Sequence, residues 1–394
     1  MGSVLVSMPF LALLRSSAPN ARIIFVTDST NRDLVAKCRI ADEIVSLDHV
    51  MTPRRALQWA RLALLMRRAG KSVFFDLQLH THRRSAAWMS ALSGAALRVG
   101  FLRSGDWLRP RVFDTLIVGN MFAPVHELYL QMARAIGCGP LADAPSESAP
   151  QLHITEADQQ EADVALNGLV QDGQHLLLVV NPNTSGKATV RRWPLDHFRA
   201  SVARILANRS DVRVVLIGTE AEFDYVERLR GNLDEFGDRV VNLAGRTSLG
   251  GLLAMLRRAD CLLTNDSGPF HFGAALGTPT VGLFGPVHPD HYGRLGGPAK
   301  TVIFYRPMVC SPCVHFVRTP PCGGDNQCMQ AIAPAEVSDA CLSLLGGMRF
   351  VRRGAGASWR FAAAPQTTSA EGVALGVWHP PEDDEAAPRF TVTC

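Results

Sequence analysis

The chain has 394 residues, of which 47% are hydrophobic and 19% charged, with a formal net charge of +4 at pH 7. This length suits two domains that each bury a core, and the composition is that of a soluble globular protein. No window offers the ~20 uninterrupted apolar residues of a membrane span. Nine cysteines are too few for a disulfide framework. We therefore expect reduced thiols and a cytoplasmic location.

The first half of the chain predicts an α/β domain over residues 1–150. It opens with a predicted helix at 4–14, whereas a doubly wound sheet begins with a strand, so we expect the first strand to be missing. Strands are predicted at 22–27, 43–47, 73–77 and 97–101, and helices at 53–68, 82–92 and 125–136.

A basic stretch runs from Arg54 to Arg111, with twelve Lys or Arg against only Asp76 and Asp106. It is either a solvated face or a surface for an anionic acceptor or a membrane. Nucleic acid is not expected as a partner, because the charges are spread over several elements without a nucleic-acid-binding motif.

Residues 137–151 are rich in Pro, Ala, Ser and Gly, which is typical of a connection between domains. A second α/β domain is predicted over 151–345, and the tail at 346–394 is expected to be poorly ordered. No G-x-G-x-x-G follows any strand, so a nicotinamide or flavin cofactor is not expected. Strands are predicted at 176–180, 212–217 and 240–243, and helices at 194–207, 220–229 and 249–257.

The stretch 262–286, LLTNDSGPFHFGAALGTPTVGLFGP, predicts a strand, a tight turn, a short helix and a second strand at 280–284. Asp266 and Ser267 stand where an N-cap belongs, Pro269 suits the first helical position, and Gly277 suits the end. A helix that starts at the carboxyl end of a parallel strand offers free N–H groups to a diphosphate. The alternative is that the D-S-G only caps the helix.

The loop after strand 176–180 reads NPNTSGKATVRRWP. Asn183 and Thr184 can donate hydrogen bonds to phosphate oxygens, and Lys187, Arg191 and Arg192 can neutralise the negative charge. The alternative is a polar loop with an aromatic staple.

These motifs resemble the donor site of glycosyltransferase family 9, the heptosyltransferases of lipopolysaccharide synthesis, over roughly residues 2–345. The resemblance implies a GT-B architecture, in which two Rossmann-like doubly wound domains face each other across a cleft. The N-terminal domain would bind the acceptor and the C-terminal domain the nucleotide sugar. The implied chemistry is inverting, metal-independent transfer without a cofactor, and the absence of a D-x-D motif agrees with it.

The resemblance places Asp266, Ser267, Gly268 and His271 at the bound nucleotide sugar. It puts the loop with Asn183, Thr184 and Lys187 across the cleft from them, with Arg191 where the family has Lys. Glu222 corresponds to the carboxylate that binds the ribose, with Glu220 as a competitor. The alternative for Glu222 is a first-turn charge that stabilises its helix.

The base that takes the acceptor proton is the weak point of the resemblance. The family uses an Asp in a G-D pair, and this chain has Gly2-Ser3 there. Serine is a poor general base at neutral pH. Either another group such as Asp76 serves, or this branch differs in acceptor or activity. Arg191 and the helix N-terminus at Ser267 and Gly268 would stabilise the departing diphosphate.

The late cysteines Cys310, Cys313, Cys322 and Cys328 could hold a structural zinc ion, although five residues separate the last two. Packed thiols or a disulfide are the alternative, and His315 is interpreted as a bystander. We expect zinc to be substoichiometric.

The sequence thus predicts transfer of a sugar, heptose from ADP-heptose, to a lipopolysaccharide core or related glycan. The partners are the nucleotide-sugar donor and an anionic glycolipid at the inner face of the cytoplasmic membrane. The rivals are a GT-B enzyme that uses a UDP-sugar, an epimerase of that architecture, and a non-catalytic nucleotide-sugar-binding protein.

Overall fold

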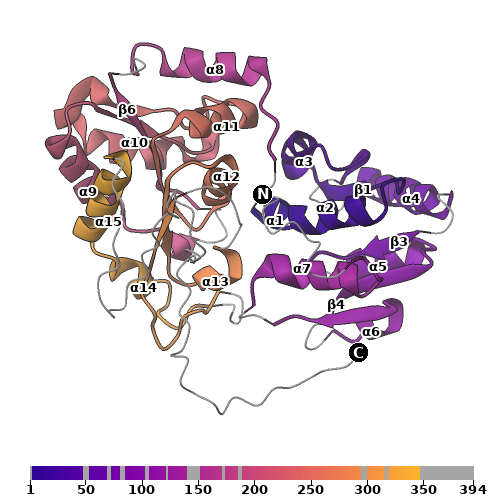
Figure 1. The fold of residues 1–394 in the computed structure, drawn as a ribbon. Helices are drawn as coiled ribbons and strands as arrows, with labels where there is room; N and C mark the ends of the chain where they lie inside the picture. The colour runs from indigo at the N-terminus through magenta and orange to yellow at the C-terminus, as the bar shows by residue number, and fades with distance from the viewer. Residues whose placement is uncertain are drawn as a thin grey trace, which may run out of the picture.

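The computed structural model describes residues 2–47, 53–68, 72–79, 85–102, 106–120, 123–139, 151–170, 174–184, 189–293, 300–314, 317 and 319–346. These residues form two α/β units with parallel sheets, shown in Figure 1 with the N-terminal unit on the right and the C-terminal unit on the left. The connection at 140–150 and the tail from residue 347 lie outside the described residues, so the predicted domain boundary and the predicted disorder of the tail stay predictions.

The C-terminal unit is built on one six-stranded parallel sheet in the order β11-β10-β9-β6-β7-β8. Its strands are almost wholly apolar because helices cover both faces. The strands are β6 (Leu176–Asn181), β7 (Val212–Leu216), β8 (Val240–Asn242), β9 (Cys261–Asn265), β10 (Thr280–Phe284) and β11 (Thr301–Tyr305). The helices are α8 (Glu156–Leu166), α9 (Leu195–Asn208), α10 (Phe223–Gly231), α11 (Leu249–Arg258), α12 (Gly268–Leu276), α13 (Pro289–Tyr292), α14 (Gln327–Gln330) and α15 (Pro334–Leu345).

The N-terminal unit contains two separate sheets among the described residues, one of β1 and β2 and one in the order β3-β4-β5. The strands are β1 (Ile24–Asp28), β2 (Glu43–Leu47), β3 (Val73–Phe75), β4 (Leu97–Leu102) and β5 (Thr115–Val118). The helices are α1 (Gly2–Val6), α2 (Met8–Ser17), α3 (Arg32–Cys38), α4 (Pro53–Arg68), α5 (Ser85–Leu92), α6 (Arg109–Val112) and α7 (Val125–Arg134). The missing first strand stays a prediction.

The predicted first helix is in fact two, α1 and α2, which meet at Ser7. The Val4 carbonyl accepts hydrogen bonds from both the Ser7 amide, at 3.1 Å, and the Ser7 hydroxyl, at 2.7 Å, at the break. Both helices bury apolar side chains in a core that also includes residues of β4, α7, α11 and α12. The two units therefore share one continuous apolar cluster.

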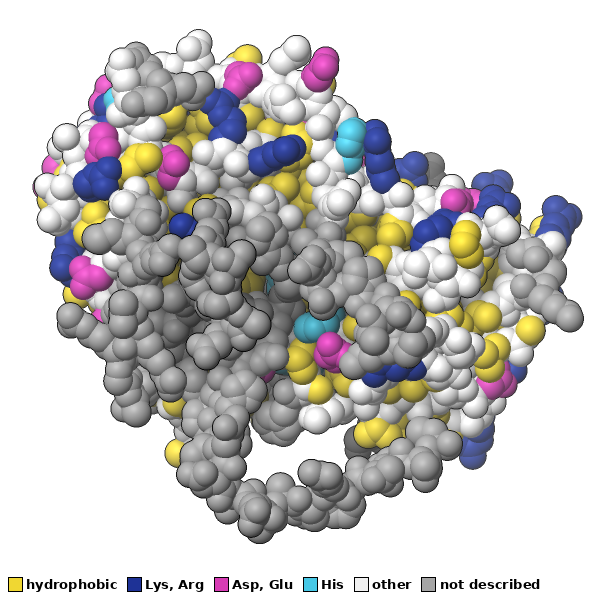
Figure 2. All heavy atoms as spheres, in the orientation of Figure 1, with side chains coloured by type: hydrophobic (Ala, Val, Ile, Leu, Met, Phe, Trp, Pro, Cys, Tyr) yellow, Lys and Arg dark blue, Asp and Glu magenta, His cyan; other side chains and the backbone are white. Residues whose placement is uncertain are grey.

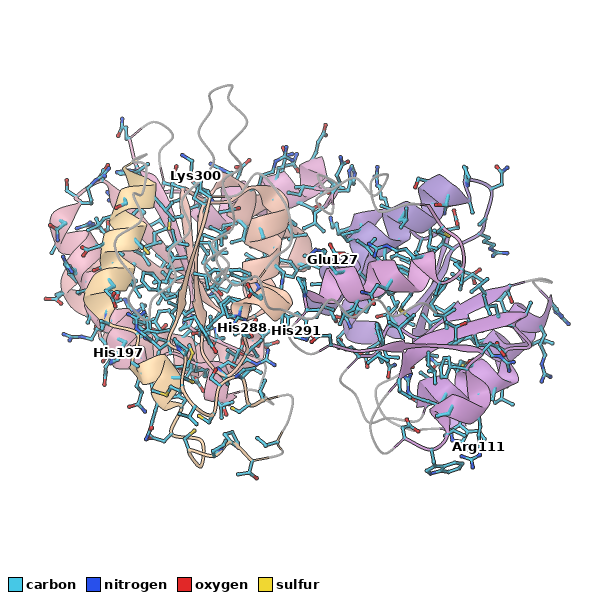
Figure 3. All side chains as sticks on the ribbon, turned by 60° about the horizontal axis from the view of Figure 1, so that its bottom comes forward. Arg111, Glu127, His197, His288, His291 and Lys300 are labelled. Atoms are coloured by element: carbon cyan, nitrogen blue, oxygen red, sulfur yellow. The ribbon has the colours of Figure 1, made fainter. Side chains whose placement is uncertain are left out.

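Polar contacts also join the two units. Lys37 on α3 pairs with Asp158 on α8, and the Lys37 carbonyl accepts a hydrogen bond from the His153 amide at 2.8 Å. On the other side, Nδ1 of His291 on α13 lies 2.7 Å from the carbonyl oxygen of Ala123, just before α7. Figure 3 shows His288 and His291 at this junction, with Glu127 of α7 near them. In addition, α1 contacts α12.

Candidate functional site

The order of the C-terminal strands identifies one crevice. The chain runs outward from β6 through β7 to β8, then returns to the other side of β6 and runs outward again through β9, β10 and β11. The loops after β6 and β9 therefore diverge in opposite directions at the carboxyl edge of the sheet. This is the topological switch point at which open α/β sheets bind ligands.

Two buried asparagines, which were not predicted from the sequence as site residues, fix the loops at this switch point. Asn181 at the end of β6 donates to Thr264 Oγ1 at 3.0 Å and to Ser267 Oγ at 2.9 Å. Asn265 at the end of β9 donates to the Pro182 carbonyl at 2.9 Å and accepts from the Trp193 amide at 3.0 Å. A polar residue that closes an otherwise apolar strand, as in LLLVVN and CLLTN, is the signal that could have found them.

The start of α12 faces this crevice without a side-chain cap. Ser267 is the N-cap residue, but its hydroxyl donates to the Asn265 carbonyl at 3.1 Å, so it caps no N–H of the helix. The first N–H groups of α12 therefore keep their capacity for an anion, and the helix dipole favours one. Gly268 is the first helical residue, so Pro269 stands second, one place later than predicted. Gly277 ends the helix with φ +79°, as predicted.

Asp266 does not cap the helix and instead pairs with Arg191. Arg191 Nη1 lies 3.3 Å from Asp266 Oδ2, and only 5% of the Asp266 side chain is exposed. Burial raises the pKa of Asp266, and the Arg191 charge opposes that rise. Arg191 Nε is buried and has no hydrogen-bond partner among the described residues. This cation is thus held beside the start of α12, with a donor to spare for a bound anion.

His271, one turn into α12, touches the N-terminal unit. Its ring packs directly against Gly2, and any side chain at that position would collide with it. Burial lowers the pKa of His271 to about 3, so the imidazole is neutral at physiological pH. Ser3 is exposed beside this contact. The Gly2-Ser3 pair, which the resemblance aligns with the family's G-D pair, therefore lies against α12 and carries a hydroxyl in place of a carboxylate.

Glu222 is the last residue of the short 3₁₀ helix Glu220–Glu222 that precedes α10, and part of its carboxylate is already used. Oε2 accepts from the Thr219 amide and hydroxyl, both at 2.9 Å, in a capping box. Oε1 lies 3.9 Å from Nη2 of Arg192, whose guanidinium stacks over the Tyr225 ring at 4.4 Å. Glu220 is exposed. The first-turn interpretation of Glu222 is seen directly, and ribose binding through Oε1 stays a prediction.

The other predicted phosphate-binding side chains are Asn183, Thr184 and Lys187, of which the structure describes the first two. Asn183 is buried, and its amide donates to the Ile217 carbonyl at 2.9 Å, so the predicted contact with phosphate is not favoured. Its Oδ1 is buried and has no hydrogen-bond partner among the described residues. Thr184 is also buried at the end of this loop. Lys187 lies outside the described residues.

Asp76, the alternative base, is buried in an ion pair, which argues against that role. Its side chain is 2% exposed and pairs with Arg109, which is 1% exposed. The other carboxylate oxygen accepts from the Gln78 amide at 3.0 Å. Burial lowers the pKa of Arg109 to about 10, so the guanidinium is still charged at neutral pH. A base needs a free lone pair at the substrate, and both Asp76 oxygens are engaged within the unit.

The late cysteines do not form the zinc site considered above. Cys310, Cys313, Cys322 and Cys328 line one small cavity, and none is in a disulfide. No group of three or more His, Cys, Asp or Glu within the described ranges is arranged to hold a metal ion. Burial raises the pKa of Cys313, and it raises that of Cys328 to about 11. Packed protonated thiols fit this arrangement, and His315 lies outside the described residues.

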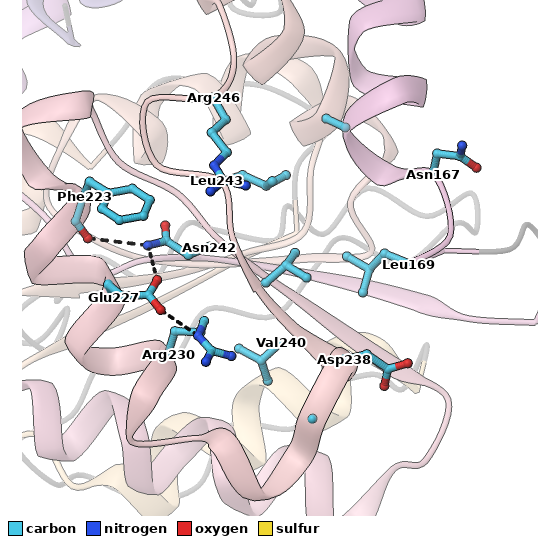
Figure 4. A pocket seen from close by; sticks show the side chains of 13 residues that line it. Asn167, Leu169, Phe223, Glu227, Arg230, Asp238, Val240, Asn242, Leu243 and Arg246 are labelled. Carbon is cyan, nitrogen blue, oxygen red and sulfur yellow. Dashed lines mark hydrogen bonds and ion pairs between the residues drawn. The ribbon is translucent and has the colours of Figure 1, made fainter.

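A larger groove of about 660 Å³ lies beside the edge strand β8, away from the switch point (Figure 4). Its polar groups bind one another: Asn242 Nδ2 donates to Glu227 at 2.7 Å, and Arg230 Nε donates to the same carboxylate at 2.7 Å. The groove therefore offers few unengaged polar atoms, and the crevice at β6 and β9 is the better candidate site.

Comparison with known sequences agrees with this assignment. The profile of glycosyltransferase family 9 (heptosyltransferase) matches residues 71–321, more than half of the chain. Lipooligosaccharide heptosyltransferase 2 of Haemophilus influenzae is 32% identical over 113 residues, which are 28% of this chain and 32% of the relative. The lipopolysaccharide core heptosyltransferase OpsX of the same species is 30% identical over 222 residues, 54% of this chain and 58% of the relative. The chain thus spans about a third to somewhat over half of these curated relatives.

Solved structures share the fold over most of the chain. A family 9 glycosyltransferase from Veillonella parvula aligns with a TM-score of 0.69 and 21% identity, covering 88% of this chain and 94% of the other. The ADP-heptose lipopolysaccharide heptosyltransferase II of Escherichia coli aligns with a TM-score of 0.66 and 20% identity, covering 87% and 95%. At these identities the likeness shows the fold, which is GT-B.

Proposed function

Because the chain belongs to glycosyltransferase family 9, the heptosyltransferase family, we propose that it transfers a sugar from a nucleotide-linked donor to a glycan acceptor. The donor is ADP-heptose and the acceptor is a lipopolysaccharide core or related glycan at the inner face of the cytoplasmic membrane. The names of the relatives support this choice, since they include a lipopolysaccharide core heptosyltransferase and an ADP-heptose heptosyltransferase.

One observation carries the proposal: a charged arginine and an uncapped helix start converge at the switch point between β6 and β9. The donor diphosphate would lie on the N–H groups of α12, with Arg191 beside it. In the transfer step the acceptor oxygen bonds to the anomeric carbon as the bond from that carbon to the diphosphate oxygen breaks. The diphosphate leaves with the electron pair, and Arg191 and α12 stabilise its growing charge.

The acceptor proton needs a base, and Ser3 gives a specific reason to keep a second candidate function. Ser3 is exposed at the junction with α12, where a carboxylate would complete the family pattern. A chain with a hydroxyl there could bind the nucleotide sugar without turning it over. Ser3→Asp separates the candidates, because the added carboxylate should raise the transfer rate only if the rest of the machinery is competent.

Binding measurements test the site itself. Calorimetry with ADP, UDP and GDP should give the tightest binding for ADP. Arg191→Ala should weaken ADP binding by about tenfold or more, because a hydrogen bond from a charged donor to the diphosphate is lost. The matched control is Arg199→Ala, which removes an exposed arginine of α9 whose Nε donates to the Asn232 carbonyl at 3.0 Å.

Each alternative has its own signature in these experiments. Tightest binding of UDP would favour the UDP-sugar enzyme or epimerase. Binding of ADP-heptose without transfer to any lipopolysaccharide acceptor would favour the binding protein. Equal losses in the Arg191 and Arg199 variants would contradict a diphosphate site beside Arg191.

A further inference from the structure

One outer face of the N-terminal unit exposes large apolar side chains on two consecutive helices, α4 and α5, and in the turn just before a third, α6. α4 contacts α5, and α5 contacts α6, so the helices lie side by side. Their outward side chains are unusually apolar for a water-facing surface. The exposed fractions are 52% for Leu57, 47% for Leu64, 52% for Trp88, 47% for Leu92 and 53% for Trp107. We call these five residues the apolar face.

The apolar side chains follow helical spacing and do not fall at random. On α4, Leu57 and Leu64 are seven residues apart, two turns of one helical side, while Leu62 faces inward and is 2% exposed. On α5, Trp88 and Leu92 are four residues apart, while Ala87, on the side of α5 that faces the sheet, is buried. Each helix therefore has an inner apolar side that packs on the unit and an outer apolar side as well.

Arginines are interleaved with this face. α4 carries five Arg and no Asp or Glu, and α5 carries no acidic residue. Arg61, Arg67 and Arg68 of α4 are exposed. Near α6, the Arg111 guanidinium lies 5.6 Å from the Trp107 ring centroid, and Figure 3 shows Arg111 at the outer edge of the unit. Figure 2 shows yellow and dark blue side chains mixed over the right-hand lobe, which is the N-terminal unit.

We propose that the apolar face docks on an anionic lipid bilayer, with the Leu and Trp side chains entering the interface and the arginines on the headgroups. Trp is suited to the boundary between headgroups and acyl chains, and long Arg stems lie along apolar surface while their charge stays in the polar layer. A helix with apolar and basic residues on its outer side is the pattern of interfacial membrane binding. No helix in the described part of the chain is long and apolar enough to cross a membrane, so attachment through these helices would be peripheral.

Charge decides in favour of a lipid over a protein partner or a second copy. A second copy would bring its own arginines against these ones, because a symmetric contact places the same patch on both sides. An anionic leaflet attracts every arginine on the face at once, and each basic residue near the surface contributes a roughly fivefold gain in partitioning.

Vesicle sedimentation of the full chain, without donor or acceptor, tests the proposal independently of the transferase activity. The protein should bind vesicles of phosphatidylglycerol and phosphatidylcholine, bind pure phosphatidylcholine much less, and be released by high salt. Leu57→Glu with Leu64→Glu should lower the partition coefficient by about tenfold or more. The matched control is Val164→Glu, which adds the same charge at a 79% exposed apolar residue on α8 of the other unit.

A second pair of variants isolates the charge. Arg61→Glu should weaken vesicle binding by about an order of magnitude, since a headgroup contact becomes a repulsion. Arg257→Glu on α11, also an exposed arginine, should change it little. Thermal melts in solution establish that each variant is folded. Trp88→Phe should reduce the blue shift of tryptophan emission on vesicle binding without abolishing sedimentation.

Three outcomes would overturn the proposal. The first is that the wild-type chain does not sediment with anionic vesicles. The second is that Val164→Glu reduces binding as much as the α4 double variant does. The third is that light scattering shows the α4 variant converting a dimer to a monomer while vesicle binding is unchanged, which would make a second copy the occupant.

Discussion

The buried pair of Asp76 and Arg109 offers a decisive test, because Asp76 was a candidate base and the structure gives it a structural role. Both side chains are almost inaccessible, at 2% and 1% exposure. Asp76→Asn removes the charge and leaves the guanidinium without its main partner. Breaking a buried pair in this way costs about 3–5 kcal/mol.

The surroundings of Arg109 place the expected cost at the lower end of that range. The guanidinium also lies 3.5 Å from Asp106, donates to the Phe101 carbonyl at 3.0 Å and lies over the Phe113 ring at 5.0 Å. We therefore expect a loss of about 3 kcal/mol, which urea titration would register as a midpoint lower by roughly 1 M.

Two further variants make the measurement specific. The double variant Asp76→Leu with Arg109→Met should recover most of the lost stability, because well-packed apolar groups often replace a buried ion pair without cost. Asp114→Asn is the matched control: its pair with Arg98 is on the same unit but 38% exposed on the Asp114 side chain, so the loss should be under about 1 kcal/mol.

The role as a base predicts the opposite pattern. Loss of a general base lowers the catalytic rate by about a hundredfold or more and leaves folding intact. If Asp76→Asn melted like the wild type and lost transfer by that factor, the reasoning from burial would be refuted.

Three further predictions concern the candidate site. Asp266→Asn should raise the melting temperature at neutral pH. Burial raises the pKa of Asp266, so above pH 3.8 the buried carboxylate destabilises the folded chain, and Asn removes that charge. Calorimetry should show weaker ADP binding, because Arg191 loses its ion-pair partner. The free energy of unfolding should fall by about 1.4 kcal/mol for each pH unit below pH 6.5. The reason is that the pKa of His271 is about 3 in the folded chain, so the unfolded chain takes up the proton first. Denaturant titrations on both sides of pH 6.5 should show this slope, and it should vanish in His271→Asn. Glu222→Gln should lower the affinity for ADP but not for 2′,3′-dideoxy-ADP, and equal losses for both would show that Oε1 does not meet the ribose.

The sequence by itself determined most of the local structure. The strands β2 and β10 and the helix α4 begin and end where periodicity predicts, and most other elements differ by a few residues. Such elements are readable because apolar spacing and Gly or Pro stops act over one turn or one strand. The stretch 262–286 was predicted in the same way, since its strand, D-S-G turn and helix are consecutive in the chain. Elements outside the prediction include β5, β11 and α15. Of these, α15 packs on α9, which lies far earlier in the chain.

Only the tertiary structure decided how the polar side chains are used. Asp76 and Arg109 are 33 residues apart, and Asn181 and Ser267 are 86 apart, so no local pattern links them. The sequence suggested a cap for Ser267, whereas the folded chain gives that hydroxyl to the Asn265 carbonyl and leaves the start of α12 without a side-chain cap. The physical reason is that a buried donor or acceptor must find a partner, and which partner is within reach is set by strand order and not by sequence spacing.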